Sequence, residues 1–142
     1  MQLSVPLPRP WWLIPVALLA AVFGVATIGS GARVLFGSDA TRAAAGRVVP
    51  FVLWFNFLAG FAYVGAGVGI ALARRWSGMV SAGIAAATAV VFLAFTLHVL
   101  TGGAFETRTV AAMSLRAGVW TAIAVVVCRR LGCMQTPWGR KE

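Results

Sequence analysis

The sequence predicts an all-α integral membrane protein, a bundle of four transmembrane helices with both termini in the cytoplasm. Of the 142 residues, 61% are hydrophobic and only 11% are charged, whereas a soluble domain is roughly half apolar and about a quarter charged. The charged residues also fall between long uncharged runs, which is typical of segments that lie in lipid. One such bundle uses up a chain of this length, so residues 1–142 are interpreted as a single transmembrane domain.

Four uncharged runs are long enough to cross a bilayer, whose hydrocarbon core of ~30 Å requires about 20 helical residues. They extend from Trp11 to Gly31, from Val49 to Ala73, from Trp76 to Leu100 and from Thr109 to Cys128, and residues 129–142 form a predicted cytoplasmic tail. The runs are predicted to be helices because backbone groups in lipid must form hydrogen bonds within their own segment.

The segments between the runs predict how the helices are connected. Ser38 or Asp39 is a suitable cap for a short surface helix from Asp39 to Gly46. The Arg74-Arg75 pair leaves a very tight connection between the second and third spans. Those two spans are therefore expected to be antiparallel neighbours.

The distribution of basic residues predicts the orientation. The side that holds both termini has seven basic residues, and the opposite side has four: Arg33, Arg42, Arg47 and Arg108. This bias favours cytoplasmic termini in a bacterial inner (cytoplasmic) membrane. Because the cations are divided between two membrane faces, the net charge of +9 favours lipid headgroups as partners and not nucleic acid.

The two cysteines, Cys128 and Cys133, fall in or near the cytoplasm on this topology. A structural disulfide is not expected in that reducing compartment. A soft metal held by the two thiolates beside Met134 is the alternative, but no histidine or third thiolate is close in the sequence. No metal site is predicted.

Small residues mark the expected contacts between helices, because helices in lipid associate by close packing. Asn56, Gly60, Tyr63 and Gly67 recur at intervals of four, three and four along one face of the second span. The predicted packing positions are Gly24, Gly60, Gly65, Gly67 and Gly69. Their partner is either internal or another subunit, so a homo-oligomer or a larger membrane complex is expected.

The polar side chains within the spans gather near one end of the bundle. The candidate polar site comprises Asn56, Tyr63, His98, Glu106, Arg108 and Arg116. Arg116 lies about 10 Å into the last span, where a charged side chain costs ~2.5 kcal/mol or more and must face the bundle. Trp120, one turn further along, is expected to lie against its guanidinium.

Two interpretations of this group are open. In the first, Arg116, Glu106 and Asn56 satisfy one another in a structural network, which requires the loop before Thr107 to fold inward. In the second, the group is a site for a small ligand, a proton or an ion, with His98 as the titrating residue.

Three stretches resemble a group of small four-span bacterial membrane proteins to which no activity is attached. They are Val34 to Phe36, Val49 to Leu72 (VPFVLWFNFLAGFAYVGAGVGIAL) and Gly102 to Trp120 (GGAFETRTVAAMSLRAGVW). The layout of four spans with a surface helix in the first loop is also similar to the DoxX-like family. That second resemblance implies membrane redox chemistry involving sulfur compounds or quinone.

The function predicted first is a non-enzymatic accessory or assembly subunit of a larger membrane complex. An enzyme is disfavoured because the sequence has no Walker motif, dinucleotide-binding fingerprint or nucleophile elbow. The alternatives are an oligomeric small transporter or channel that uses the polar site, and a DoxX-like redox component. No cofactor is predicted, bound lipid is expected, and a quinone belongs to the redox alternative.

Overall fold

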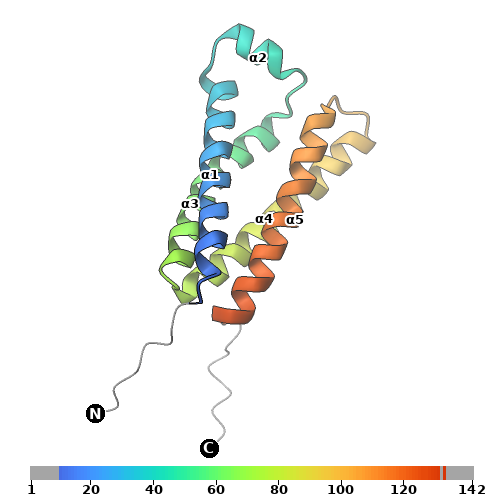
Figure 1. The fold of residues 1–142 in the computed structure, drawn as a ribbon. Coiled ribbons are helices and arrows are strands. Elements are labelled where there is room, and N and C mark those ends of the chain that lie inside the picture. Colours follow the sequence, from blue (N-terminus) through green and yellow to red (C-terminus); the bar gives the residue numbers. More distant parts are fainter. Residues whose placement is uncertain (1–9, 132, 134–142) are drawn as a thin grey trace, which may run out of the picture.

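A computed structural model describes residues 10–131 and 133, which form five helices and no strand. The helices are α1 (Leu13–Phe36), α2 (Asp39–Ala45), α3 (Pro50–Ala71), α4 (Arg75–Leu100) and α5 (Thr107–Leu131). The four long helices alternate in direction, and α2 crosses one end of the bundle (Figure 1). Each long helix is apolar enough to span a membrane. The all-helical prediction is therefore confirmed, and the length and composition of the helices indicate a multi-pass membrane protein.

Two of the helices extend beyond the spans predicted for them. The first span was expected to end at Gly31, but α1 continues to Phe36 and so includes Arg33. The last begins at Thr107 and runs to Leu131, so Arg129 and Arg130 are helical and do not belong to a tail. The predicted spans end where charged residues begin. The helices continue further because their backbone hydrogen bonds continue through those charged residues. Basic residues in a last turn also interact favourably with the helix dipole.

The short helix α2 forms as expected, one residue shorter than predicted. Ser38 is its N-cap, and the Ser38 hydroxyl accepts a hydrogen bond from the Thr41 amide at 3.4 Å. Gly46 ends the helix with a φ of 75°, a left-handed conformation that glycine adopts without steric cost.

The predicted antiparallel pairing of α3 and α4 is confirmed. Only residues 72–74 separate the two helices, which pack against each other. The Ala73 and Arg74 amides donate to the carbonyls of Ile70 and Gly69, both at 2.9 Å. These bonds close the end of α3 and reverse the chain.

The closest helix pair is α1 with α3, and glycines make this approach possible. A Cβ atom added to Gly24 would lie 2.8 Å from the Gly60 carbonyl oxygen, and one added to Gly67 would lie 2.9 Å from the Ala17 carbonyl oxygen. Both distances are too short for real contacts. These three glycines therefore lie where the α1 and α3 backbones touch.

The other two predicted packing glycines differ from each other. Gly69 faces α4, where an added Cβ would lie 2.6 Å from the Trp76 ring. An added Cβ at Gly65 would meet no described atom within 4 Å. Gly65 is therefore not at a helix contact within this chain, because its face of α3 has no neighbouring helix.

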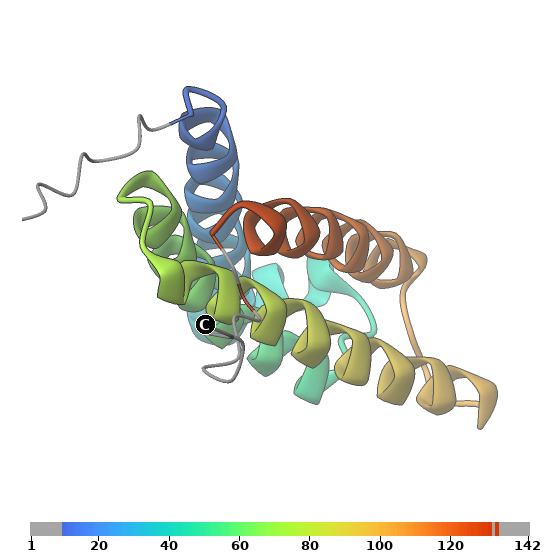
Figure 2. The same cartoon turned by 90° about the horizontal axis from the view of Figure 1, so that it is seen from below.

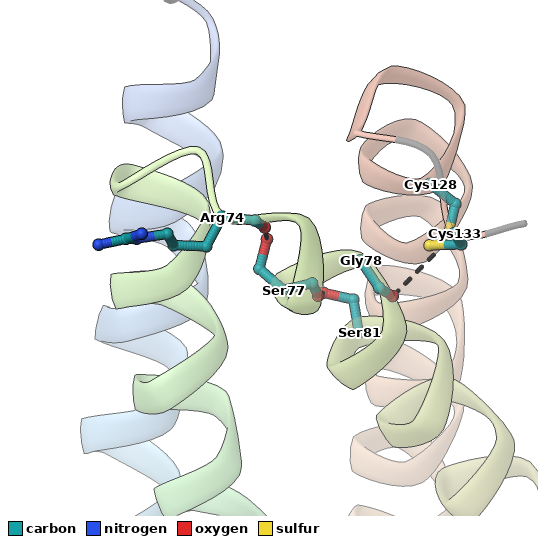
Figure 3. Close-up of a disulfide and its surroundings, with 6 residues drawn as sticks. All are labelled: Arg74, Ser77, Gly78, Ser81, Cys128 and Cys133. Atoms are coloured by element: carbon teal, nitrogen blue, oxygen red, sulfur yellow. Dashed lines mark hydrogen bonds between the residues drawn. A yellow bond between two sulfur atoms is a disulfide. The ribbon is translucent and has the colours of Figure 1, made fainter. Parts of the chain in front are cut away.

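Cys128 and Cys133 form a disulfide, so the expectation that they would not is wrong (Figure 3). The helix ends at Leu131 and the chain turns back, which brings the two Cα atoms to 4.7 Å. The Cys133 sulfur packs on Gly78 of α4, where an added Cβ would lie 2.5 Å from it. The Cys128 sulfur lies 3.5 Å from the Gly78 carbonyl oxygen. This contact is a hydrogen bond only in the thiol form, because a disulfide sulfur has no hydrogen.

The long helices form two pairs, α1 with α3 and α4 with α5, which are joined by the contact of α3 with α4 (Figure 2). Helices α1 and α5 are not among the closely packed pairs, and they diverge towards the α2 end (Figure 1). Between 22% and 28% of each apolar span is buried inside the protein. The remaining apolar surface faces outward, as expected for a protein whose solvent is lipid.

Candidate functional site

A cavity of about 450 Å³ lies at the α2 end of the bundle, bounded by α1, α2, α3 and α5. We call it the arginine cavity because Arg33, Arg108 and Arg116 line it. Much of the remaining wall is apolar, with valines from α1, from α3 and from the segment before α3. The cavity therefore combines fixed cations with an apolar wall.

The positive charge of this cavity has no counter-charge among the described residues. No acidic side chain of residues 10–131 lines it. Asp39 is fully exposed and lies 3.7 Å from Arg42, the one ion pair among the described residues. Arg33 and Arg108 are exposed, and Arg116 is half-buried. An anion in this cavity would meet three positive charges and no described carboxylate.

Glu106 does not join Arg116. Its Oε1 accepts a hydrogen bond from the Arg47 amide at 3.0 Å, and its carboxylate packs on Gly46. The loop before α5 thus folds towards the loop that follows α2 and not towards the interior. The expected network of Arg116, Glu106 and Asn56 is therefore not formed, and Glu106 instead fastens two loops together.

Arg108 holds α2 in place above the cavity. One terminal nitrogen of its guanidinium donates to the carbonyls of Ala44 and Ala45, at 3.2 Å and 3.1 Å. These are the last carbonyls of α2, which have no partner within the helix. Arg108 bonds to the last carbonyls of α2, and Glu106 bonds to the Arg47 amide just after α2. The start of α5 is therefore attached to the C-terminal end of α2.

Arg116 and Asn56 lie deepest in the arginine cavity. The Arg116 guanidinium carbon lies 6.0 Å from the centre of the Phe23 ring, so the cation meets Phe23 and not, as expected, Trp120. Arg116 Nε and Asn56 Oδ1 are buried and have no hydrogen-bond partner among the described residues. Each such group costs about 1–3 kcal/mol, and a charged group costs more.

Further buried polar atoms lie beyond Arg116 and Asn56, inside the bundle. Tyr63 and Trp120 are fully buried, and their ring centres lie 4.5 Å apart. The Trp120 indole nitrogen has no hydrogen-bond partner within residues 10–131, and the neighbouring hydroxyls of Tyr63 and Thr88 form no hydrogen bond of good geometry. Asn56 and Tyr63 are two turns apart on α3, and Arg116 and Trp120 are one turn apart on α5. Unpaired donors and acceptors from three helices thus face one interior column.

His98 lies outside this arrangement. Its Nε2 is 3.3 Å from the Ala104 carbonyl oxygen, and its ring meets the edge of Phe51 at 6.2 Å between centres. It therefore stabilises the turn after α4. His98 does not line the arginine cavity, whereas Arg116 and Asn56 do.

Several cavity residues were missed in the sequence. Arg33 was assigned to a loop, although Thr27, Ser30 and Arg33 recur every three residues and all line the cavity. That spacing is typical of one helix face, so it is the signal in the sequence that indicates a helical Arg33 on the same face as Thr27 and Ser30. No pattern in the sequence pointed to Thr88 or to the contact of Phe23 with Arg116, because both depend on how the helices pack.

Comparisons with protein-family models, with curated proteins and with solved structures find no match in any of the three.

Proposed function

We propose that this is a multi-pass protein of the bacterial cytoplasmic membrane that binds a small anionic ligand in the arginine cavity. The observation that supports the proposal is a cavity lined by three arginines and by no acidic residue of the described chain. A carboxylate or a phosphate supplies the missing negative charge. Either group also matches the planar fork of a guanidinium, which binds two oxygens at once.

The energetics support a ligand over a structural role for Arg116. A charged side chain at this depth is costly, and in membrane proteins such residues pair with another group or mark a binding pathway. Arg116 makes no ion pair within residues 10–131, and its Nε has no hydrogen-bond partner there. The cost of placing it is offset when an anion binds.

Asn56 adds selectivity to the charge. Its unpaired Oδ1 is an acceptor in a cavity that arginines also line, so it favours a ligand that also has a hydroxyl or another donor. A site with a buried acceptor discriminates strongly against ligands that leave the acceptor unpaired.

The accessory-subunit hypothesis and the redox alternative with a bound quinone remain predictions, and the arginine cavity favours neither. Transport would begin with the same binding step. It requires in addition an oligomer that completes a pathway through the membrane, which is a prediction of its own.

The experiment compares Arg116→Gln with Arg130→Gln in mild detergent. Both variants lose one positive charge, but Arg130 lies at the opposite end of the bundle, 5.7 Å from the Trp12 ring centre. Inorganic phosphate, butyrate and palmitate are titrated against each protein by calorimetry. We expect Arg116→Gln to weaken binding of the bound anions about tenfold or more, which is ~1.4 kcal/mol, and Arg130→Gln to leave it unchanged. Equal affinity in both variants would contradict the proposal.

A further inference from the structure

A second cavity lies next to the arginine cavity, between α1 and α5. Its volume is about 240 Å³, and we call it the apolar cavity because every side chain that lines it is apolar. They are Val16 and Leu19 from α1 and Val119, Ala122, Ile123 and Val126 from α5. None of these residues lines the arginine cavity.

The two cavities follow the same face of α5. Thr109, Ala112 and Arg116 line the arginine cavity, and Val119, Ile123 and Val126 line the apolar cavity. Successive members of this series are three or four residues apart, which places all of them on one helix face. The distance along the helix from Arg116 to Val126 is about 15 Å.

The facing side of α1 shows the same order. Thr27 lines the arginine cavity, Leu19 and Val16 line the apolar cavity, and Phe23 lies between them in the sequence. The seam between α1 and α5 therefore has a cationic cavity towards α2 and an apolar cavity towards the disulfide end. Between the two cavities, Phe23 packs against the core and contacts Arg116.

We infer that the ligand is an acidic amphiphile with a hydrocarbon chain, an inference that rests on the proposed function. Its anionic group lies at Arg116, and its chain extends past Phe23 into the apolar cavity. Charge complementarity selects this occupant, because basic pockets between transmembrane helices suit acidic lipid headgroups. A second copy of this chain is a poorer match, since the acidic residues of the described part are only Asp39 and Glu106.

The first experiment tests which part of the ligand is recognised. The protein is reconstituted in nanodiscs of neutral phosphatidylcholine with a photoreactive palmitate whose diazirine lies near the chain end. Palmitate, butyrate and cetyl alcohol compete for the labelled site. We expect palmitate to compete about tenfold better than either of the others, and cross-links to map to residues 16–19 and 119–126.

The second experiment closes the apolar cavity. Ala122→Phe fills it from α5, and the matched control is Ala87→Phe, since Ala87 is exposed on α4 and lines neither cavity. We expect Ala122→Phe to weaken palmitate binding about tenfold and to leave the binding of inorganic phosphate or butyrate unchanged. The control should bind all three probes as the wild type does.

The outcomes separate this inference from the proposed function. Equal binding of palmitate and butyrate, or unchanged palmitate binding in Ala122→Phe, would overturn the inference and leave the anion site intact. Competition by cetyl alcohol or by a long-chain quinone as strong as that by palmitate would show that the chain alone is recognised, which also overturns it. If none of the anions binds the wild type, the proposed function itself fails.

Discussion

The two ends of the bundle treat their polar side chains in opposite ways. At the end that holds the disulfide, Ser77 and Ser81 are fully buried, and their hydroxyls donate to the carbonyls of Arg74 and Ser77 at 2.6 Å and 2.8 Å (Figure 3). At the α2 end, Asn56 Oδ1 and Arg116 Nε are buried without a partner in the described chain. The two serines are satisfied by neighbouring backbone carbonyls, whereas the two groups at the cavity have no described partner, as the proposed anion site requires.

The packing of the two ends differs in the same sense. Gly67 meets α1, and Gly69 and Gly78 meet groups near the disulfide end at distances that exclude a Cβ atom. At the α2 end, α1 and α5 diverge (Figure 1), and α2 closes the space through its bonds to Arg108. The helices therefore pack closely at the disulfide end, and at the other end they leave space for the arginine cavity beneath α2.

The largest effect is expected from disturbing the tight packing at Gly67. In Gly67→Leu the new side chain collides with the α1 backbone at Ala17, so we expect a loss of about 3 kcal/mol in stability. Gly65→Leu is the matched control, because no described atom lies within 4 Å of its Cβ position. Thermal unfolding in detergent measures both. A similar melting temperature for the two variants would refute the contact.

A smaller effect is expected from removing the disulfide. The Cys128→Ser, Cys133→Ser double variant opens a loop with a sequence separation of 5, and closing so short a loop stabilises a chain by about 2 kcal/mol. Reductant should lower the melting temperature of the wild type to that of the double variant and leave the variant unchanged. A wild type that is insensitive to reductant would contradict this.

The smallest effects contrast one polar residue from each end. Asn56→Leu removes a buried acceptor that has no partner, so we expect stability without ligand to rise by about 1 kcal/mol while anion affinity falls. Ser81→Ala removes a satisfied hydroxyl, so stability should fall by about 1 kcal/mol with affinity unchanged. Thermal unfolding and phosphate titration measure the two properties. Destabilisation of both variants would mean that Asn56 has a partner within the protein.

The helices and the face of α3 that packs were predictable from the sequence, because both follow from local patterns. That α1 is the partner of this face was not predictable. Hydropathy located four helices, and the spacing of Gly60 and Gly67 located the face that packs. The pattern does not say which faces of a helix have neighbours within the chain, so it did not single out Gly65. Its open surroundings became visible only once the four helices were placed together.

The candidate site was predictable in composition but not in arrangement. Arg116 and Asn56 were identified by their depth in an apolar span, which is a property of the sequence alone. The contacts of Glu106 with the Arg47 amide and of Arg116 with Phe23 depend on loop paths and on helix rotation. The disulfide was missed for a related reason, since it depends on the turn that follows Leu131.

Whether Cys128 and Cys133 are bonded in living cells depends on the side of the membrane on which they lie, so their redox state indicates the topology of the protein. The distribution of arginines favours a cytoplasmic position for this end of the bundle, where glutathione and thioredoxin keep cysteines reduced. A bond that persists after rapid acid trapping of intact cells would instead place these sulfurs on the periplasmic side. The arginine cavity would then draw its ligand from the inner leaflet.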